Sequence, residues 1–569
     1  MANLADGVSL DDLSKNESIK AGSNHLRGRI ADELDEDSPA FGEESEQLLK
    51  FHGVYQQDDR DRRKEARARG LDKHHQLMIR TRIPGGVVSP DAYIAHDDIS
   101  QRWANGTLRV TTRQDFQLHG VLKGDLKKSI AAINHALLTT LGGCGDVERN
   151  IMCCPEPRSD AFHAEVDSTI RALVAALAPR TGAYHEIWLD GEVVRSSEPE
   201  VDPLYGEQYL PRKFKTTVAV EGDNCVDVYA HDLALVAMRG PGGTVRGFNV
   251  LVGGGLGRTH HKPETFVAIA LPLAFVAPEQ AVDISRAVIE VQRDYGDRTN
   301  RKHARLKYTI ADRGLDWLRA EVQARVPFQL QPPETLHWLP VDDHLGWHEQ
   351  GDGNLYAGIY VENGRIADVG AARYRSGLRQ IVEEIRPQVR LTAQQNVILA
   401  GISPSQRARV EELLRGHGIA TVDSIPRAIR HSMACPAIPT CGLAVAEAER
   451  ALPGLIRQIA ALLDELGLAE ERISFRMSGC PNGCSRPYLG DVGFVGTTLG
   501  KYDVMLAGDF DGTRLNRAFA PNVPISEISS LLRPIFIEFR SDRGPGEGFG
   551  DWVDRVGFDV LREKVQQPA

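Results

Sequence analysis

Apolar and polar residues alternate in two short stretches of the chain that align with each other without a gap. The first is LRVTTRQDFQLHGV at residues 108–121, and the second is VRLTAQQNVILAGI at residues 389–402. Such alternation predicts strands that bury one face. A helix-like stretch follows each copy, KKSIAAINHALLTTLG after the first and PSQRARVEELLRGHGI after the second. The pattern therefore predicts an internal duplication, with two related α+β halves around a pseudo-twofold axis.

The two copies differ in charge at matched positions. Arg113 and His119 of the first copy correspond to Gln394 and Ala400 of the second, whereas the apolar positions agree. The first copy has kept charge at these positions and the second has lost it. This difference indicates one live site, in the first copy, and one structural remnant in the second.

Two stretches between the copies carry candidate chemistry. YLPRKFKTTVAV at 209–220 predicts an alternating strand with Lys213 and Lys215 on one face. RGFNVLVGGGLGRTHHK at 246–262 contains a glycine run, but Arg258 stands where the last glycine of a dinucleotide fingerprint belongs, and no G-K-[ST] follows. We therefore expect a loop whose backbone can approach a large planar or phosphate-bearing group.

The length of 569 residues predicts several domains. We divide the chain into an N-terminal arm at 1–76 that can dock a partner, a first half-repeat at 77–145, an α/β domain at 146–346, a second half-repeat at 347–423 and a cysteine-bearing domain at 424–569. DDRDRRKEARARG in the arm mixes charges densely and predicts a solvated helix or a salt-bridged segment, with a docking strand or a loop over a cofactor as the alternative. GLAVAEAERALPGLIRQIAALLDELG predicts a helix interrupted at Pro453.

Composition sets limits on the function. The hydrophobic content of 42% and the charged content of 25% are those of an ordinary globular protein. A net charge of −11 argues against nucleic-acid binding, so an anionic substrate needs a local positive pocket. The N-terminus is polar and acidic, and the longest apolar run, 266–277, is broken by Pro272. We therefore expect a cytoplasmic protein without a signal peptide or a membrane span.

Four of the eight cysteines form two tight pairs, Cys435 with Cys441 and Cys480 with Cys484. In a reducing compartment such pairs indicate metal or redox chemistry. The first pair is wider than a zinc knuckle, and its surroundings are apolar and rich in glycine and proline. Spacing alone favours an iron–sulfur cluster and leaves structural zinc or no metal open. The remaining cysteines fit no ligand pattern, and two of them are expected to be core thiols, Cys153 and Cys154; the others are Cys144 and Cys225.

The C-x5-C and C-x3-C pairs resemble the signature of the sirohaem and [4Fe–4S] sulfite/nitrite reductases. The resemblance extends over nearly the whole chain through LRGRIADEL, FHGVYQQDDRD, RTRIPGGV, TRQDFQLHG, LPRKFKTTV, GFNVLVGGGLG, SMACPAIPTC, GCPNGC and GEGFGD. Within the family the chain is most similar to the assimilatory NADPH-type haemoprotein branch. The resemblance implies a three-domain α+β fold, in which the duplicated halves are ferredoxin-like and the other domains enclose the cofactors.

The resemblance also implies the site. Six-electron reduction of sulfite to sulfide would occur at a sirohaem coupled to the cluster, as part of sulfate assimilation. Cys435, Cys441, Cys480 and Cys484 would hold the cluster, and Cys484 would bridge it to the sirohaem iron. The anion-binding residues would be Arg80, Arg149, Lys213 and Lys215. The sirohaem carboxylates would meet Arg113, His119 and Asn482, and less strongly Arg82 and Arg109.

Electrons must come from outside, because the chain has no flavin or nicotinamide fingerprint. The resemblance implies a separate flavoprotein α subunit that carries FAD and FMN and uses NADPH, with a ferredoxin as the other donor. Two alternatives to this function stay open. One is a sirohaem nitrite reductase, and the other is a non-catalytic binding protein stabilised by zinc.

Overall fold

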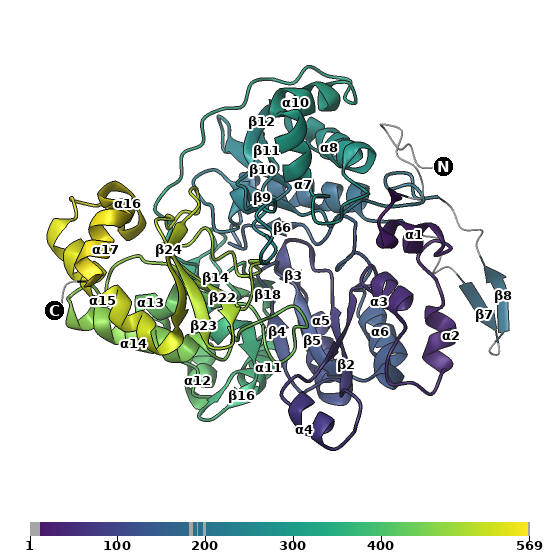
Figure 1. Cartoon of the computed structure of the whole chain (residues 1–569), viewed down its shortest axis with the longest axis horizontal. Helices are drawn as coiled ribbons and strands as arrows, with labels where there is room; N and C mark the ends of the chain where they lie inside the picture. Colours follow the sequence, from purple (N-terminus) through teal and green to yellow (C-terminus); the bar gives the residue numbers. More distant parts are fainter. Residues whose placement is uncertain (1–11, 181–185, 190–191, 197–200, 567–569) are drawn as a thin grey trace.

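The two aligned stretches fold into the same antiparallel hairpin. In the first copy β4 (Leu108–Val110) pairs with β5 (Phe116–Val121), and in the second β18 (Gln388–Leu391) pairs with β19 (Val397–Ile402). In this computed structural model, which describes residues 12–180, 186–189, 192–196 and 201–566, both hairpins lie near the middle of the molecule (Figure 1).

Each hairpin belongs to a five-stranded sheet that ends in a short strand from the other copy. The first sheet has the order β1-β2-β5-β4-β15, with β1 at Val54–Asp58, β2 at His75–Arg80 and β15 at Arg365–Ile366. The second has the order β13-β14-β19-β18-β3, with β13 at Gly346–Glu349, β14 at Leu355–Ile359 and β3 at Val87–Val88. The exchange is reciprocal, because β15 pairs with β4 and β3 pairs with β18. The predicted duplication into α+β halves is confirmed.

Helices follow the hairpins as the periodicity predicts. The first half contains α5 (Pro90–Trp103) and α6 (Leu126–His135), and the second contains α11 (Tyr374–Ile385) and α12 (Arg407–Gly416). α5 packs against α11 across the junction, and the apolar side chains of both sheets share one core. The two halves therefore form one body.

A third sheet lies between the halves in the sequence and forms the upper lobe in Figure 1. Its order is β12-β11-β10-β9-β6, with β6 at Met152–Cys153, β9 at Thr216–Val220, β10 at Leu233–Arg239, β11 at Val245–Val252 and β12 at Leu271–Val276. The helices of this lobe are α7 (Ala161–Leu177), α8 (Ala281–Tyr295), α9 (Leu306–Arg313) and α10 (Leu315–Gln323). The small hairpin of β7 (Glu186–Leu189) and β8 (Glu192–Ser196) precedes β9 in the chain.

The prediction of a strand over 209–220 was wrong for its first part. β9 begins at Thr216, and all five of its residues are buried rather than alternately exposed. β9 lies in the sheet interior with a parallel partner on each side, and such strands are buried on both faces. Pro211 lacks a backbone N–H for ladder pairing, which is consistent with irregular structure before the strand. Lys213 and Lys215 therefore belong to the segment that leads into β9.

The cysteine-bearing region forms a fourth large sheet, drawn in green and yellow in Figure 1. Its order is β20-β21-β22-β23-β24, with β20 at Ser432–Ala434, β21 at Phe475–Ser478, β22 at Val492–Thr498, β23 at Lys501–Leu506 and β24 at Arg517–Pro524. Its longer helices are α14 (Leu452–Glu465), α15 (Ile525–Asp542), α16 (Phe549–Val556) and α17 (Phe558–Gln566). The helix predicted after Cys441 starts only at Leu452. Pro453 lies in its first turn, where proline is tolerated, and does not interrupt the helix as predicted.

The described part of the N-terminal arm is built into the body of the protein. Its strand β1 is an edge strand of the first sheet and pairs with β2. The boundary predicted at residue 76 falls inside β2, which begins at His75. The arm's helices are α1 (Lys15–Ala21), α2 (Ile30–Asp35), α3 (Glu43–Leu49) and α4 (Arg63–Ala68). Ile19 and Leu48 pack into the hydrophobic core of the upper lobe. The polar N-terminus at residues 1–11 lies outside the described residues, and the other domain boundaries stay predictions.

The densely charged stretch 58–70 includes the short exposed helix α4, as predicted for a solvated segment. The same stretch also touches the cysteine region. The guanidinium of Arg60 donates to the carbonyl oxygens of Cys441 at 3.0 Å and Ala444 at 2.6 Å. None of the helices among the described residues is long and apolar enough to span a bilayer.

Candidate active site

The two cysteine pairs come together because they follow adjacent parallel strands. β20 and β21 pair in parallel, and Cys435 and Cys480 lie just beyond their carboxyl ends. The backbone N–H of Gly479 lies 3.4 Å from Cys435 Sγ, and the Gly479 carbonyl accepts hydrogen bonds from two N–H groups of the first cysteine loop. Short loops at the ends of neighbouring strands thus bring four thiols to one edge of the sheet.

The four thiols differ in burial. Cys435 and Cys480 are buried, Cys441 is half-buried and Cys484 is exposed. Burial and the nearby Cys484 raise the pKa of Cys480 to about 12, and burial raises the pKa of Cys435 well above its usual value. Thiols held this way are protonated until a cation with strong affinity for sulfur displaces the protons.

The spacing of these sulfurs tests which metal group they fit. Four thiolates on one zinc ion lie about 3.8 Å apart, because each bond is about 2.3 Å long. Among the described residues, the two groups of three or more potential ligand atoms within 4.8 Å of one another consist of other side chains. No three of these four sulfurs form such a group among the described residues, so their arrangement is more open than that of the ligands of one zinc ion and is compatible with a larger inorganic core such as an iron–sulfur cluster. The Asn482 amide reaches the same place, with Nδ2 at 3.5 Å from Cys480 Sγ.

The predicted anion-binding side chains converge from separate elements. Arg80 ends β2, Arg149 precedes β6, and Lys213 and Lys215 precede β9. Burial, followed by the charges of Arg149 and Arg212, lowers the pKa of Lys213 to about 7. Burial and Lys213 lower the pKa of Lys215 well below its usual value. Neither lysine ammonium has a hydrogen bond or ion pair to another described residue, so both can serve a ligand.

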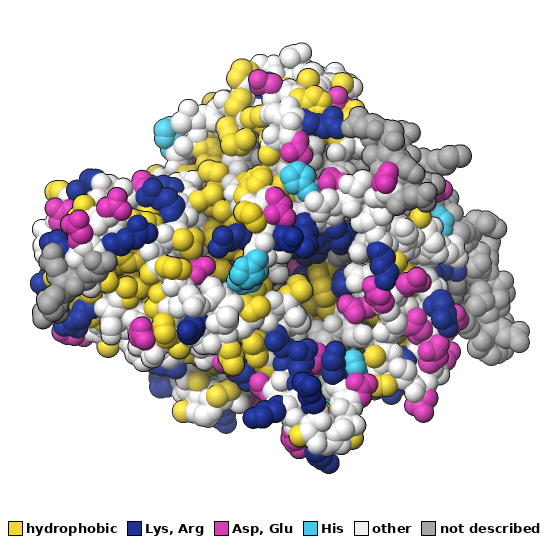
Figure 2. Space-filling model, in the orientation of Figure 1, with side chains coloured by type: hydrophobic (Ala, Val, Ile, Leu, Met, Phe, Trp, Pro, Cys, Tyr) yellow, Lys and Arg dark blue, Asp and Glu magenta, His cyan; other side chains and the backbone are white. Residues whose placement is uncertain are grey.

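Several buried guanidinium groups have N–H donors without an acceptor. Among them are Nε and Nη1 of Arg113, Nε and Nη2 of Arg82, and Nε of Arg149. An unpaired buried donor costs free energy, and more so when it is charged. Figure 2 shows Lys and Arg side chains gathered around a hollow near the centre of one face. A ligand with many carboxylates, such as sirohaem, together with a small oxyanion would supply the missing acceptors.

The carboxyl groups in this region do not cancel the positive charge. Burial raises the pKa of Glu148 to about 8 and that of Asp115 to about 7. Glu148 is thus mostly neutral near pH 7 and Asp115 is about half neutral, so the two carboxyl groups offset only part of the positive charge. The local excess of positive charge contrasts with the net charge of −11 for the whole chain. The local positive pocket that an anionic substrate requires is present.

The cations and the cysteine edge are neighbours. Cys484 is among the groups whose charge acts on the pKa of Lys213, where it favours the protonated form. Thr112, in the turn of the first hairpin, donates to the Cys484 carbonyl at 2.9 Å. Arg486 donates to the Thr112 carbonyl at 2.9 Å and to the Ala393 carbonyl at 2.8 Å. The turns of both hairpins therefore hold the second cysteine loop.

Two expected site residues have other roles in the structure. Arg109 is only 1% exposed, and its guanidinium is paired with Glu449 and donates to the Ala434 carbonyl at 2.9 Å. It ties the first hairpin to the strand that precedes Cys435. Burial, then the nearby charges of Arg365 and Arg109, lowers the pKa of His119 well below its usual value. His119 is therefore neutral at pH 7 and offers a hydrogen-bond donor rather than the cation we expected.

Sequence reasoning missed a tyrosine and a cysteine beside the cations. Tyr55 Oη lies 2.6 Å from Cys144 Sγ, and Arg80 Nη1 lies 3.2 Å from the same sulfur. Burial and the charge of Cys144 raise the pKa of Tyr55 to about 12. The only available signal was that Tyr55 belongs to FHGVYQQDDRD, since Cys144 lies far along the chain in an unremarkable glycine-rich loop.

The glycine run follows β11 and meets the cysteine region. Lys307 Nζ donates to the carbonyl oxygens of Gly255 at 3.0 Å and Gly257 at 2.8 Å, and the Arg258 N–H donates to the Pro481 carbonyl at 3.1 Å. A Cβ on Gly254 would lie 2.3 Å from the Tyr229 carbonyl oxygen. At Gly254 the missing side chain therefore lets the glycine loop pack closely against the backbone of Tyr229, and not against a ligand as we expected.

Comparison with known proteins agrees with the fold and the site. The model of the nitrite and sulphite reductase 4Fe-4S domain matches residues 167–330 and 429–569, and that of the nitrite/sulfite reductase ferredoxin-like half domain matches 69–136 and 348–417. A sulfite reductase [ferredoxin] of Synechococcus elongatus is 45% identical over 97% of this chain and 90% of its own length. A sulfite reductase [NADPH] hemoprotein beta-component of Methylobacterium sp. is 47% identical over 96% of this chain and 91% of its own length.

Among solved structures, the fold is similar to that of the Mycobacterium tuberculosis NirA protein. The TM-score is 0.79, with 23% sequence identity over 97% of this chain and 98% of that chain. This likeness concerns the fold, and it confirms the predicted three-domain α+β architecture. The two matches of the half-domain model fall on the two sheets that exchange strands.

Proposed function

We propose, because the chain belongs to the nitrite and sulphite reductase family, that it reduces sulfite to sulfide by a six-electron reaction. The observation that carries this proposal is the convergence of unpaired buried cations beside the exposed thiol of Cys484. The family's cofactors are sirohaem and a [4Fe–4S] cluster, and the residues present fit both. A zinc-stabilised binding protein is no longer an alternative.

Each part of the site has a chemical role in this proposal. Cys435, Cys441, Cys480 and Cys484 would hold the cluster, and the unpaired donors of Arg82 and Arg113 would serve the sirohaem carboxylates. When bound, the two cofactors supply electrons and an iron site for the sulfur atom. The protein must then bind the anion, exclude competing water and bring protons to the departing oxygens.

The arginines and lysines divide this work. Arg80 and Arg149 stay charged and can donate to sulfite oxygens from their guanidinium groups. Lys213 has a pKa of about 7, so it can give up a proton at neutral pH and take up another from solvent. Bound sulfite, being negative, would raise the pKa of both lysines and charge them before each proton transfer. Lys213 and Lys215 are therefore our candidates for the proton donors.

The electron donor is a separate protein in this proposal. Curated relatives of similar identity include ferredoxin and NADPH types, so their names support an external donor without selecting one. We propose a flavoprotein α subunit using NADPH, with ferredoxin as the alternative. The exposed helix α4 is our docking candidate, because Arg60 just before it bonds to the cysteine loop. A cytoplasmic location stays a prediction.

The first test is an absorption spectrum of the purified protein with iron and acid-labile sulfide analysis. We expect sirohaem bands that shift when sulfite is added to the reduced protein, and about five iron atoms per chain from one cluster and one haem. A colourless protein would contradict the proposal. Turnover of sulfite and nitrite measured side by side, with each donor, then decides the substrate and the partner.

Lys215→Ala tests the site itself. We expect sulfite turnover to fall by about 10²-fold or more, because a positioned proton donor contributes that much, while the cofactor spectrum stays nearly unchanged. Lys262→Ala, at an exposed position outside the site, is the matched control and should keep full activity. Full activity of Lys215→Ala would remove this lysine from the site.

A further inference from the structure

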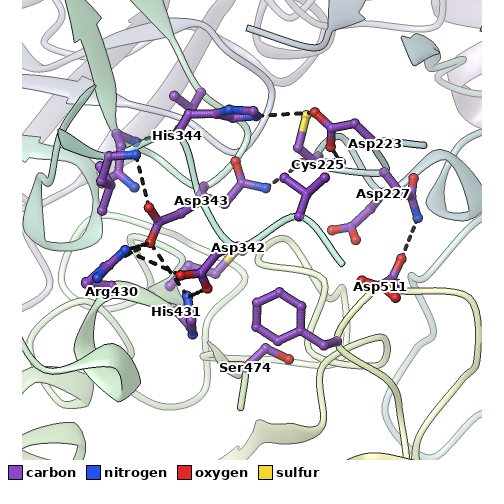
Figure 3. Close-up of a pocket in the computed structure, with 18 of the residues that line it drawn as sticks. Asp223, Cys225, Asp227, Asp342, Asp343, His344, Arg430, His431, Ser474 and Asp511 are labelled. Atoms are coloured by element: carbon purple, nitrogen blue, oxygen red, sulfur yellow. Dashed lines mark hydrogen bonds and ion pairs between the residues drawn. The ribbon is translucent and has the colours of Figure 1, made fainter. Parts of the chain in front are cut away.

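A pocket away from the proposed active site lies where three parts of the molecule meet. These are the upper lobe, the segment 339–345 that leads into the second half, and the cysteine-bearing region. The volume of the pocket is about 80 Å³. Figure 3 shows His344, Cys225 and Asp223 side by side along one wall of the pocket, and His431 and Ser474 on the opposite side. Gln394, the neutral counterpart of Arg113, donates from its amide to the Cys225 carbonyl. The pocket therefore adjoins the turn of the second hairpin.

Four potential metal ligands converge at one wall of this pocket. They are Cys154, Asp223, Cys225 and His344, and their ligand atoms all lie within 4.8 Å of one another. Asp223 Oδ2 lies 3.1 Å from Cys154 Sγ and 3.3 Å from His344 Nε2. Ligands of one zinc ion are about 3.3–3.8 Å apart, because the bonds are about 2.0–2.3 Å long. The two distances from Asp223 are close to that range, and the remaining pairs of ligand atoms lie within 4.8 Å.

The ligand positions are set by the fold rather than by flexible loops. Cys154 follows β6 and Asp223 follows β9, and these two strands run in parallel side by side. The Cys225 N–H donates to Asp223 Oδ1 at 2.7 Å, which leaves Oδ2 to face the other ligands. His344 immediately precedes β13, at a point where its carbonyl oxygen packs against Gly358.

The residues are also buried enough to hold an ion firmly. Cys154 is 5% exposed, Asp223 is 7% exposed and His344 is 9% exposed. Two thiolates, one imidazole and one carboxylate are the donor types that zinc takes, and four protein ligands make a closed structural site. A neighbouring group, Asp342, Asp343 and His431, is less suited, because Arg430 already pairs with Asp343 at 2.6 Å.

We propose that Cys154, Asp223, Cys225 and His344 bind one zinc ion. The ion would link the sheet of the upper lobe to the segment that leads into the second half. It would lie near the turn of the second hairpin, which carries no charged residue. This site is separate from the four cysteines of the cluster and does not depend on the reaction proposed above.

The test is element analysis of the holoenzyme, purified without a metal-affinity step from cells supplied with zinc. We expect about one zinc per chain beside the iron. X-ray absorption at the zinc edge should show two sulfur ligands at about 2.3 Å and two nitrogen or oxygen ligands at about 2.0 Å. This measurement is blind to the iron of the cofactors and needs no variant.

Variants locate the ion. Cys225→Ser and His344→Ala should reduce zinc to below about a tenth per chain by removing a ligand, while the iron content and the sirohaem spectrum are retained. Cys153→Ala is the matched control, because Cys153 is an equally buried neighbour outside the ligand group, and its zinc content should equal that of the wild type.

Three results would overturn the proposal. One is zinc at background in the wild-type protein. The second is zinc that is retained in Cys225→Ser and His344→Ala, which would place the ion elsewhere. The third is a disulfide between Cys154 and Cys225, detected by mass spectrometry after alkylation under non-reducing conditions.

Discussion

The turns of the two duplicated hairpins have the same backbone and different chemistry. Gln114 and Gln395 occupy matched positions, and both have left-handed φ angles, 57° and 69°. In each turn this residue's N–H donates at 3.1 Å to the carbonyl of the threonine three residues earlier, Thr111 or Thr392. The duplicated element is therefore a precise backbone shape that survives on both sides of the pseudo-twofold axis.

The side chains on that shape have diverged. The first turn carries Arg113 and Asp115, and Arg113 lies near the charges of Arg80 and Arg149. The second turn carries Gln394 and Asn396 at the same places. Arg113 has donors without acceptors, while the Gln394 amide finds a partner within the protein. The comparison teaches that the fold depends on the backbone of the turn and that the site depends on the charge placed on it.

The largest effect should come from making the first turn resemble the second. We expect Arg113→Gln to lower sulfite turnover by about 10²–10³-fold, because it removes a fixed charge that faces the ligands. Gln394→Ala in the second turn should leave turnover within about twofold, since it removes one hydrogen bond outside the site. Steady-state kinetics with a dye donor measures both, and similar losses in the two variants would contradict the comparison.

The next effect concerns the matched arginines of the first strands. Arg109 is buried and paired with Glu449, whereas Arg390 is half-buried and donates to Gln388 at 2.8 Å. Arg109→Gln should reduce the free energy of unfolding by about 3 kcal/mol, because it removes a buried guanidinium and leaves the half-buried Glu449 carboxylate with Arg365 as its remaining ion-pair partner.

Arg390→Gln is the counterpart in the second half. It should change the free energy of unfolding by less than about 0.5 kcal/mol, as is usual for a substitution away from buried networks. Denaturant titrations of the two variants give the comparison directly. Equal losses in the two variants would contradict the predicted difference between the two arginines.

A pH profile separates the lysines from the fixed arginines. Because Lys213 has a pKa of about 7, its charge is present below pH 7 and is lost as the pH rises. We expect kcat/KM for sulfite to fall above pH 7 by up to about tenfold per pH unit. Lys213→Arg should flatten this limb, because a guanidinium stays charged. The ratio of the two profiles cancels the ionisation of the anion itself, and a constant ratio would exclude Lys213.

The smallest effect tests whether the two backbones are equivalent. Gly120 and Gly401 have φ angles of 79° and 78°, a conformation that other residues adopt at a cost. Gly401→Ala should destabilise the fold by about 1 kcal/mol through this strain alone, since a Cβ there meets no neighbour. Gly120→Ala should cost somewhat more, because the added Cβ would lie 3.0 Å from Asn105 Cβ. Thermal unfolding measures both.

Local patterns in the sequence predicted the parts of the structure that local physics controls. The hairpins follow from alternation, and the two cysteine loops follow from their spacing. The strand over 209–220 was only partly right, because sequence alternation does not reveal that β9 lies inside a sheet with partners on both sides. The helix after Cys441 was placed too early because Pro453 was read as an interruption instead of a first-turn residue.

The groups that sequence analysis missed are assembled from distant segments. Cys154 was expected to be a core thiol and does lie in the hydrophobic core, but it comes close to Cys225 and His344 only after three elements have packed together. Tyr55 of strand β1 and Cys144 of a distant loop likewise meet only in the folded chain. Such sites have no characteristic spacing along the chain, so only the fold reveals them.

The strand exchange between the two halves has a consequence for how the molecule unfolds. Because β3 completes the second sheet and β15 completes the first, neither half has all its strands without the other. We expect the halves to unfold in one cooperative step, as segments that share a core do. The half that lost its charged turn therefore cannot be deleted. Each half supplies an edge strand that the sheet of the other half requires, so neither is a self-contained structural unit.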